Sequence, residues 1–371
     1  KGVGTSMKHF ALNNQEYRRL TIDAVVDERA MFELYLSAFE RVLRQVQPWT
    51  VMCSYNRVKG VNASDNRWLL TDVLRDKFGF NGLVVSDWGA VNDRVAGVSA
   101  GLDLEMPYVG PYHDRQIEQA VRSGKLSESE VDLCAARVVA LREKAKKRKT
   151  RSFDAEAHNA LAREAAAASC VLLKNENRLL PLAAGANIAV IGAFAKVPRY
   201  QGAGSSKVQP PRLESAYDEL LKLGFQAEYA AGYDEATDAP DETLLHEACA
   251  LAEKKDAAIL FVGLPDRYES EGFDRESLAM PENHVALIRR VCAVNPHVAV
   301  VLSCGSVVDL GWADLPQSVL LTYLGGQAIG GAVADVLAGK VVPSGKLAES
   351  WPLQLDDTPS RAYFPGYTRT V

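Results

Sequence analysis

The chain has 371 residues, of which 47% are hydrophobic and 24% are charged, and its formal net charge is only −5. A chain of this length and composition can bury substantial cores and suggests about two domains of an ordinary globular protein. So small a charge argues against binding to nucleic acid or to an anionic membrane surface. No apolar run approaches the roughly 20 residues of a membrane-spanning helix.

The cysteines and histidines point away from disulfide and metal chemistry. The six cysteines are dispersed in apolar surroundings without a C-x-x-C pair, so we expect reduced core thiols, with disulfides as the minority alternative. The six histidines lack the paired spacing of metal ligands, and neither a metal nor a cofactor is implied. The compartment stays open between cytoplasm and periplasm, because the chain starts at Lys1 and is expected to be cut from a longer protein.

Residues 1–150 are predicted to form a first domain in which strands, polar loops and helices alternate. The pair Ser127 and Glu130 is typical of a capping box at the start of a long helix. Strands are predicted at residues 4–11, 51–53, 83–85 and 102–107, and helices at 28–46, 66–78, 91–100, 115–122 and 128–147.

Residues 151–371 are predicted to form a second domain with a fresh α/β pattern. The basic run at residues 144–149 precedes the boundary and is interpreted as solvated charge at a helix C-terminus rather than as a polyanion site. Strands alternating with helices at this spacing imply a mostly parallel sheet covered on both faces. Strands are predicted at residues 171–173, 188–191, 227–229, 257–262, 298–302 and 319–323, and helices at 155–168, 217–223, 242–253, 282–294 and 329–337.

The glycine-rich stretch at residues 202–207 invites comparison with a phosphate-binding loop. It fails the G-x-x-x-x-G-K-[ST] spacing, and no acidic partner for a ribose is evident. We therefore predict a plain turn there.

The stretch at residues 82–89 joins an apolar run to a carboxylate, an indole and a glycine. Its continuous β-prone character predicts a strand buried on both faces that ends near Asp87. In parallel α/β proteins, chemistry gathers at the C-terminal ends of strands. The alternative is that Asp87 caps the helix predicted from residue 91. Asp103 and Glu105, further along, are interpreted as polar scaffold.

A long polar loop rich in acids follows the strand predicted at residues 257–262. Long loops at strand ends are usually functional or disordered. Glycoside hydrolysis uses two carboxyl groups, one as nucleophile or base and the other as acid. The sequence offers one carboxylate on a rigid strand end and another on a mobile loop.

Five motifs, in the expected order from Lys1 to about Pro365, resemble glycoside hydrolase family 3, the β-glucosidase group. Together they are far more specific than any one of them. They are Lys-His-Phe at residues 8–10, Ser-Tyr-Asn at 54–56, the run 78–88 ending in Ser-Asp-Trp, Gly-Leu-Asp-Leu-Glu-Met-Pro at 101–107, and Glu-Ser-Glu-Gly-Phe-Asp-Arg at 269–275.

The resemblance implies a fold and a pair of catalytic groups. The fold is the C-terminal part of a (β/α)8 TIM-like barrel followed by an α/β sandwich domain with a mostly parallel sheet. Asp87 would be the nucleophile of a retaining hydrolysis and Glu271 the general acid/base, the two carboxyls facing each other at about 5 Å. Glu269 is a competitor for the second role, because loop lengths vary at this position.

Four further residues match positions that bind the sugar in this family, and Glu269 is expected to bind substrate if Glu271 is the acid/base. Lys8 and His9 would hold hydroxyls next to the cleaved bond, Tyr55 would lie beside the nucleophile, and Trp88 would stack on the apolar face of the sugar. The structural alternatives are a buried ion-pair partner for Lys8, a satisfied core histidine for His9, and core aromatics for Tyr55 and Trp88.

The chain also departs from the family. Members usually carry further N-terminal residues that form the first barrel strands, and many carry a C-terminal fibronectin-like domain. A half barrel exposes sheet edges and an open core, so the missing segment is expected from the full-length chain. Three hypotheses follow: a β-glucosidase acting on small carbohydrates, a β-xylosidase or broad exo-glycosidase, and a non-catalytic fragment that binds sugar or a partner. A homo-oligomer is compatible with each.

Overall fold

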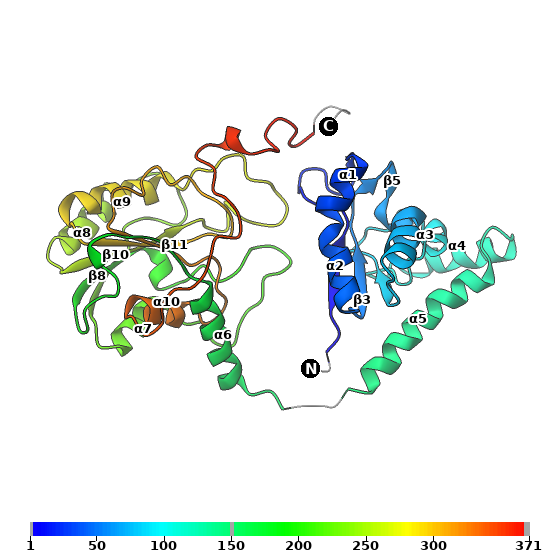
Figure 1. Cartoon of the computed structure of the whole chain (residues 1–371), viewed down its shortest axis with the longest axis horizontal. Helices are drawn as coiled ribbons and strands as arrows, with labels where there is room; N and C mark the ends of the chain where they lie inside the picture. The colour runs from blue at the N-terminus through cyan, green and yellow to red at the C-terminus, as the bar shows by residue number, and fades with distance from the viewer. Residues whose placement is uncertain (1–2, 149–151, 367–371) are drawn as a thin grey trace. The chain divides into compact units, whose positions relative to one another are not determined.

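The computed structural model describes residues 3–148 and 152–366 and divides into two compact units (Figure 1). Unit 1 comprises Lys1–Ser152 with Tyr363–Val371, and unit 2 comprises Phe153–Ala362. The boundary expected between residues 150 and 151 lies outside the described residues. Each unit has its own hydrophobic clusters, so each is described by itself.

Unit 1 is built on a three-stranded parallel sheet in the order β1 (Ser6–Phe10), β3 (Thr50–Cys53) and β6 (Leu83–Val85). All three residues of β6 are buried, as its uninterrupted apolar sequence predicted. The strand predicted at residues 102–107 was wrong, because only Leu104 forms an isolated parallel bridge beside Val85. The reason is that the Asp103 side chain, and not a backbone carbonyl, accepts the N–H of Val84, at 2.7 Å.

Helices surround this sheet largely where the sequence placed them. The predicted helix at 28–46 is confirmed but contains a π-helical turn, and the capping box of Ser127 and Glu130 is present at the start of α5. The helical segments are α1 (Glu28–Ala30), the π turn Met31–Tyr35, α2 (Ser37–Gln45), the 3-10 turn Ala63–Asp65, the π-helix Trp68–Lys77, α3 (Arg94–Ala100), α4 (Pro111–Arg122) and α5 (Glu128–Lys146). A second small sheet holds β2 (Asp23–Ala24), β4 (Arg57–Val58) and β5 (Val61–Asn62).

Unit 2 is a six-stranded sheet in the order β7-β12-β11-β10-β8-β9. The first strand, β7, pairs antiparallel with β12, and the other pairings are parallel, so the sheet is mostly parallel as predicted. Its strands are β7 (Val171–Asn175), β8 (Asn187–Ile191), β9 (Gln226–Ala230), β10 (Ala257–Gly263), β11 (Val298–Ser303) and β12 (Ser318–Leu321). Its helical segments are α6 (Ala155–Ser169), α7 (Ala216–Lys222), α8 (Glu242–Ala252), α9 (Glu282–Val294), α10 (Ile329–Leu337) and the 3-10 turns Glu176–Arg178, Ala193–Ala195 and Leu355–Asp357.

Both faces of this sheet are covered by helices. In Figure 1, α8 and α9 lie on one face and α7 and α10 on the other. Two separate hydrophobic clusters fill the two interfaces, one with Leu287 of α9 and one with Val333 of α10. The central strands β10 and β11 are buried at every position, so they form a rigid platform for the loops that follow them.

Neither a membrane-crossing helix nor a metal-binding cluster occurs in the part of the chain that the structure describes. No described helix is long and apolar enough to span a bilayer, and no three His, Cys, Asp or Glu side chains within residues 3–148 and 152–366 are grouped to hold an ion. All six cysteines are free thiols. Burial raises the pKa of the Cys53 thiol to about 12, so this thiol is a protonated core group.

The end of β10 depends on a glycine and a histidine. Gly263 has a φ of 151°, and a methyl group there would overlap the carbonyl oxygen of Ser303, so no larger residue fits. Nδ1 of His284, on α9, lies 3.2 Å from the N–H of Gly263 and 3.0 Å from its carbonyl oxygen. Burial lowers the pKa of His284 from 6.5 to about 3, so the ring is neutral, and the tautomer sets whether Nδ1 accepts the Gly263 N–H or donates to the Gly263 carbonyl.

The neutral ring makes the stability of unit 2 depend on pH. Because the pKa of His284 is lower in the folded than in the unfolded state, its contribution is full above about pH 6.5 and is lost as the pH falls toward 3. We expect about 3 kcal/mol of unfolding free energy to be lost between pH 6.5 and pH 4. Urea unfolding should show a shallower pH dependence for His284→Gln and an unchanged one for the exposed control His246→Gln. Equal slopes in all three proteins would contradict the assignment.

Candidate active site

Asp87 follows β6 at the C-terminal end of the unit 1 sheet. The strand end is fixed by Ser86, whose N–H donates to the carbonyl of Leu104 at 2.9 Å and whose hydroxyl accepts the N–H of Met106 at 2.8 Å. A tight turn follows, in which the N–H of Ala90 donates to the carbonyl of Asp87 at 3.1 Å. Asp87 is thus held on a rigid element rather than on a free loop.

The Asp87 carboxylate is buried, yet only one of its oxygens is hydrogen-bonded. Oδ1 accepts the N–H of Trp88 at 2.8 Å, whereas Oδ2 is buried without a hydrogen-bond partner among the described residues. Nε2 of His9 lies 3.5 Å from Oδ2, close enough for an ion pair but without hydrogen-bond geometry. A buried carboxylate oxygen without a hydrogen bond costs stability, which makes Asp87 a candidate for a functional role.

The helix-cap alternative for Asp87 was wrong. Helix α3 begins at Arg94, and its cap is Asp93, whose carboxylate accepts the N–H groups of Val95 and Ala96, both at 3.0 Å. Asp87 therefore has no capping function to explain its burial.

Strand β1 brings Lys8 and His9 to the same end of the sheet. Its pairing with β3 is irregular between Met7 and Phe10, where β1 has one residue more than its partner. Such a bulge redirects side chains and is common beside active sites. The His9 side chain is 33% exposed and faces Asp87, so it is not a core histidine. Lys8 is exposed and forms no ion pair with a described residue, so the buried-pair alternative was wrong as well.

Tyr55 and Trp88 are linked by one hydrogen bond. The Tyr55 hydroxyl donates to the carbonyl of Trp88 at 2.9 Å, and the Arg19 guanidinium lies 5.1 Å from the centre of the Tyr55 ring. The Trp88 side chain is 52% exposed, so it is not a core aromatic. Unit 1 therefore brings together Asp87, His9, Tyr55 and Trp88.

In unit 2, the acidic loop leaves the end of β10, and its two predicted candidates have different surroundings. The Glu269 carboxylate accepts the N–H of Gly305 at 3.0 and 3.1 Å and the hydroxyl of Ser306 at 2.6 Å. Nη2 of Arg199 lies 3.7 Å from it. With only 11% of its side chain exposed, Glu269 ties the loop to the end of β11 through both of its oxygens.

Glu271 contacts the glycine-rich stretch that the sequence predicted to be a plain turn. Its Oε2 accepts the N–H of Ser205 at 2.7 Å, and its own N–H donates to the carbonyl of Ala203 at 3.3 Å. Glu271 is half-buried, so part of its side chain faces solvent. The contribution of Gly204 and Ser205 was not predicted, since the only signal in the sequence was the pair of glycines itself.

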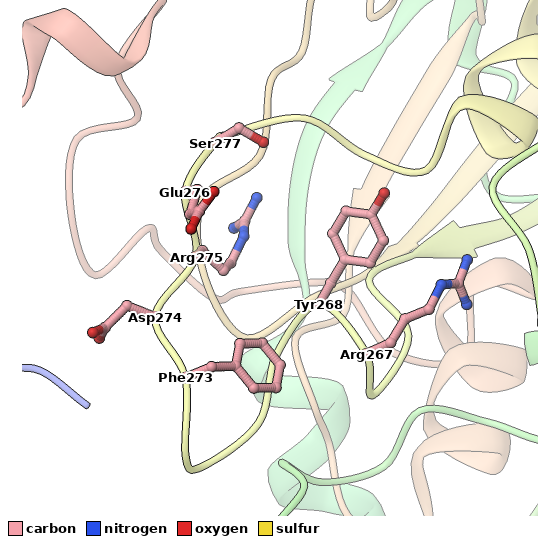
Figure 2. A pocket seen from close by; sticks show the side chains of 7 residues that line it. All are labelled: Arg267, Tyr268, Phe273, Asp274, Arg275, Glu276 and Ser277. Carbon is pink, nitrogen blue, oxygen red and sulfur yellow. The ribbon is translucent and has the colours of Figure 1, made fainter. Parts of the chain in front are cut away.

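Beyond Glu271 the same loop encloses a pocket of about 330 Å³. Figure 2 shows the rings of Tyr268 and Phe273 and the guanidinium of Arg275 on the inner side of the loop, whereas Asp274 points away. The Arg275 guanidinium donates to the carbonyl of Val307 at 2.6 Å, which holds this wall in place. The lining residues are Arg267, Tyr268, Phe273, Asp274, Arg275, Glu276 and Ser277.

The bonding of Glu269 predicts a structural cost when it is replaced. Glu269→Ala leaves the Gly305 N–H and the Ser306 hydroxyl without their acceptor, so we expect a loss of about 2 kcal/mol in the free energy of unfolding. Glu276→Ala, on the exposed part of the same loop, should change it by less than about 0.5 kcal/mol. Urea unfolding measures both. Equal values for the two variants would mean that the Glu269 contacts do not stabilise the loop.

Comparison with protein families gives two matches that cover nearly the whole chain. Residues 1–141 match the N-terminal domain of glycosyl hydrolase family 3, and residues 170–370 match the C-terminal domain of the same family. The second match alone spans more than half of the chain.

Known proteins agree with this assignment. Over 99% of the chain, the identity is 50% to thermostable β-glucosidase B of Acetivibrio thermocellus and 48% to an exo-α-(1→6)-L-arabinopyranosidase of Bifidobacterium longum. The chain covers 49% and 50% of these two proteins, so it spans about half the length of the curated relatives it matches.

A solved structure supports the fold. The crystal structure of a β-glucosidase from Bifidobacterium adolescentis superposes with a TM-score of 0.94 at 47% identity, over 99% of this chain and 55% of that one. The predicted fold class, the C-terminal part of a (β/α)8 barrel followed by an α/β sandwich domain, is thereby confirmed. This chain belongs to glycoside hydrolase family 3.

Proposed function

We propose that the chain carries the catalytic groups of a retaining, exo-acting β-glycosidase that releases terminal β-D-glucose. The observation that carries the proposal is Asp87, a buried carboxylate at a strand end with one oxygen that no described donor occupies. The 50% identity to a β-glucosidase supports the choice of sugar.

In the first step, an oxygen of Asp87 attacks the anomeric carbon and the bond to the leaving-group oxygen breaks. Glu271 gives its proton to that oxygen, so the leaving group departs as a neutral alcohol and the sugar remains as an ester on Asp87. In the second step, the Glu271 carboxylate takes a proton from water while the water oxygen attacks the anomeric carbon. Asp87 is released as a carboxylate, and the product keeps the β configuration.

Glu271 rather than Glu269 is proposed as the acid/base because of how the two are bonded. Both oxygens of Glu269 are engaged by donors of the loop after β11. Oε2 of Glu271 accepts the N–H of Ser205, and the residue is partly exposed, so a substrate can reach it. A group that must give and take a proton needs such access.

The remaining predicted residues are proposed to bind the sugar. His9 lies close enough to Asp87 to orient a hydroxyl between them, and Lys8 offers an exposed ammonium on the same strand. The half-exposed indole of Trp88 offers an apolar face for stacking. Tyr55 is proposed to fix this indole through the Trp88 carbonyl.

A second candidate substrate is a pentopyranoside. It is favoured by the 48% identity to an exo-α-(1→6)-L-arabinopyranosidase, which is nearly as high as the identity to the β-glucosidase. The β-xylosidase or broad exo-glycosidase hypothesis falls in the same class. Initial rates of the intact protein on nitrophenyl β-glucosides, β-xylosides and α-L-arabinopyranosides would rank the three.

The proposed roles predict two different variant phenotypes. Asp87→Ala should abolish turnover, because no ester can form. Glu271→Ala should lower kcat/KM on substrates with poor leaving groups by about 10²–10⁴-fold, the usual contribution of a general acid. Azide should restore turnover of an activated aryl glucoside by Glu271→Ala and yield the β-glycosyl azide, which can be identified by NMR.

Glu247→Ala, at an exposed position of α8, is the control for the intact protein and should behave as the parent. If the folded parent binds glucose but turns over none of the gluco-, xylo-, glucurono- or arabinosides, the non-catalytic binding hypothesis takes the place of this proposal. Rescue by azide of Glu269→Ala instead would exchange the roles of the two glutamates.

A further inference from the structure

Two segments of unit 2 run side by side, residues 199–207 and the first part of the acidic loop at residues 264–271. Ala203 and Ser270 form a parallel bridge. The N–H of Glu271 donates to the carbonyl of Ala203 within this bridge, and the N–H of Ser205 donates to Oε2 of Glu271. We call residues 199–207 the bracing segment, because its backbone contacts both the backbone and the carboxylate of Glu271.

The bracing segment is also attached at the base of the acidic loop. The guanidinium of Arg199, which is 8% exposed, donates from Nε to the carbonyl of Leu264 at 2.7 Å and from Nη1 to Asp266. The ammonium of Lys207 donates to the other oxygen of Asp266 at 2.7 Å. Because cations from both ends of the segment share one carboxylate, the acidic loop is held at its base as well as at Glu271.

Gly204 sets how closely the two segments can approach. Its φ is 99°, and a methyl group there would overlap Cβ of Glu271 and lie 2.9 Å from Oε2. Gly202, two residues earlier, has open space around the same position. A side chain at residue 204 would therefore push the Glu271 side chain away, whereas one at residue 202 would not.

We propose that the bracing segment positions Glu271 for proton transfer, with Gly204 and Arg199 as positioning residues; this inference rests on the proposed acid/base role of Glu271. A long polar loop has many conformations, and a general acid works only within hydrogen-bond reach of the leaving oxygen. A misplacement of about 1 Å costs about 10²-fold in rate. The segment removes that freedom through fixed backbone contacts rather than through burial of the carboxylate.

The test compares Gly204→Ala with Gly202→Ala in the intact protein on two aryl β-glucosides. 4-Nitrophenyl glucoside needs protonation of its leaving oxygen more than 2,4-dinitrophenyl glucoside does. We expect Gly204→Ala to lower kcat/KM about 10- to 100-fold on the first and less than about threefold on the second. Gly202→Ala should match the parent on both. A loss of stability alone would reduce the folded fraction and would therefore lower kcat/KM by the same factor on both substrates.

Asp266→Asn supplies a second variant in case Gly204→Ala does not fold. It keeps the shape of the side chain but removes the charge that Arg199 and Lys207 share. We expect Asp266→Asn to lower kcat/KM more on 4-nitrophenyl glucoside than on 2,4-dinitrophenyl glucoside, by a smaller factor than Gly204→Ala does. Circular dichroism verifies that each variant is folded.

The outcomes separate this inference from the proposed function. If the parent is inactive, or if Glu271→Ala keeps the parent's leaving-group dependence, the proposed function or its acid/base assignment fails. If the parent and Glu271→Ala behave as proposed but folded Gly204→Ala and Asp266→Asn match Gly202→Ala on both substrates, the bracing segment does not position Glu271.

Discussion

The geometry of unit 1 depends on one buried carboxylate shared by two arginines. Asp103 accepts hydrogen bonds from Arg75 at 2.7 Å, from Arg137 at 2.9 Å and from the N–H of Val84 at 2.7 Å, with no part of its side chain exposed. These bonds join β6 to the π-helix before it and to α5 after it. Removing one partner of such a cluster leaves an uncompensated buried charge, which costs about 3–5 kcal/mol. The position of Asp87, three residues beyond Val84 on a turn, follows from this attachment of β6.

In unit 2, the Glu269 carboxylate also joins separate segments of the chain. Glu269 collects donors from the segment after β11, with Arg199 nearby, and thereby joins the end of one central strand to the loop of the next. In both units, a carboxylate that accepts hydrogen bonds at both oxygens joins separate segments of the chain. Asp87 differs, because its buried Oδ2 has no hydrogen-bond donor among the described residues. In unit 1, hydrogen bonding thus distinguishes Asp87 from Asp103 more sharply than burial does, because the two residues are almost equally buried.

Much of this was predictable from the sequence, since it depends on local signals. Residues close together in the sequence determine the apolar run of β6, the capping box of α5 and the alternation of strands and helices in unit 2. The prediction of a strand near Leu104 was wrong, because the Asp103 side chain accepts the Val84 N–H in place of a backbone carbonyl. The periodicity of the sequence does not reveal such a substitution. The bonding of Glu269 and the approach of Gly204 to Glu271 were hidden for another reason. Their partners lie tens of residues away, and only the folded sheet brings them together.

The antiparallel pairing of β7 with β12 has a consequence for synthesis on the ribosome. β7 is the first strand of unit 2 and β12 the last, so the edge of the sheet closes only after every other strand has been made. At about 5–20 residues per second, β7 waits on the order of ten seconds for β12, its neighbour in the sheet. Throughout that time its backbone N–H and C=O groups are open to other nascent chains. Truncated products that end before β12 therefore carry an uncovered β7 strand that can pair with another chain.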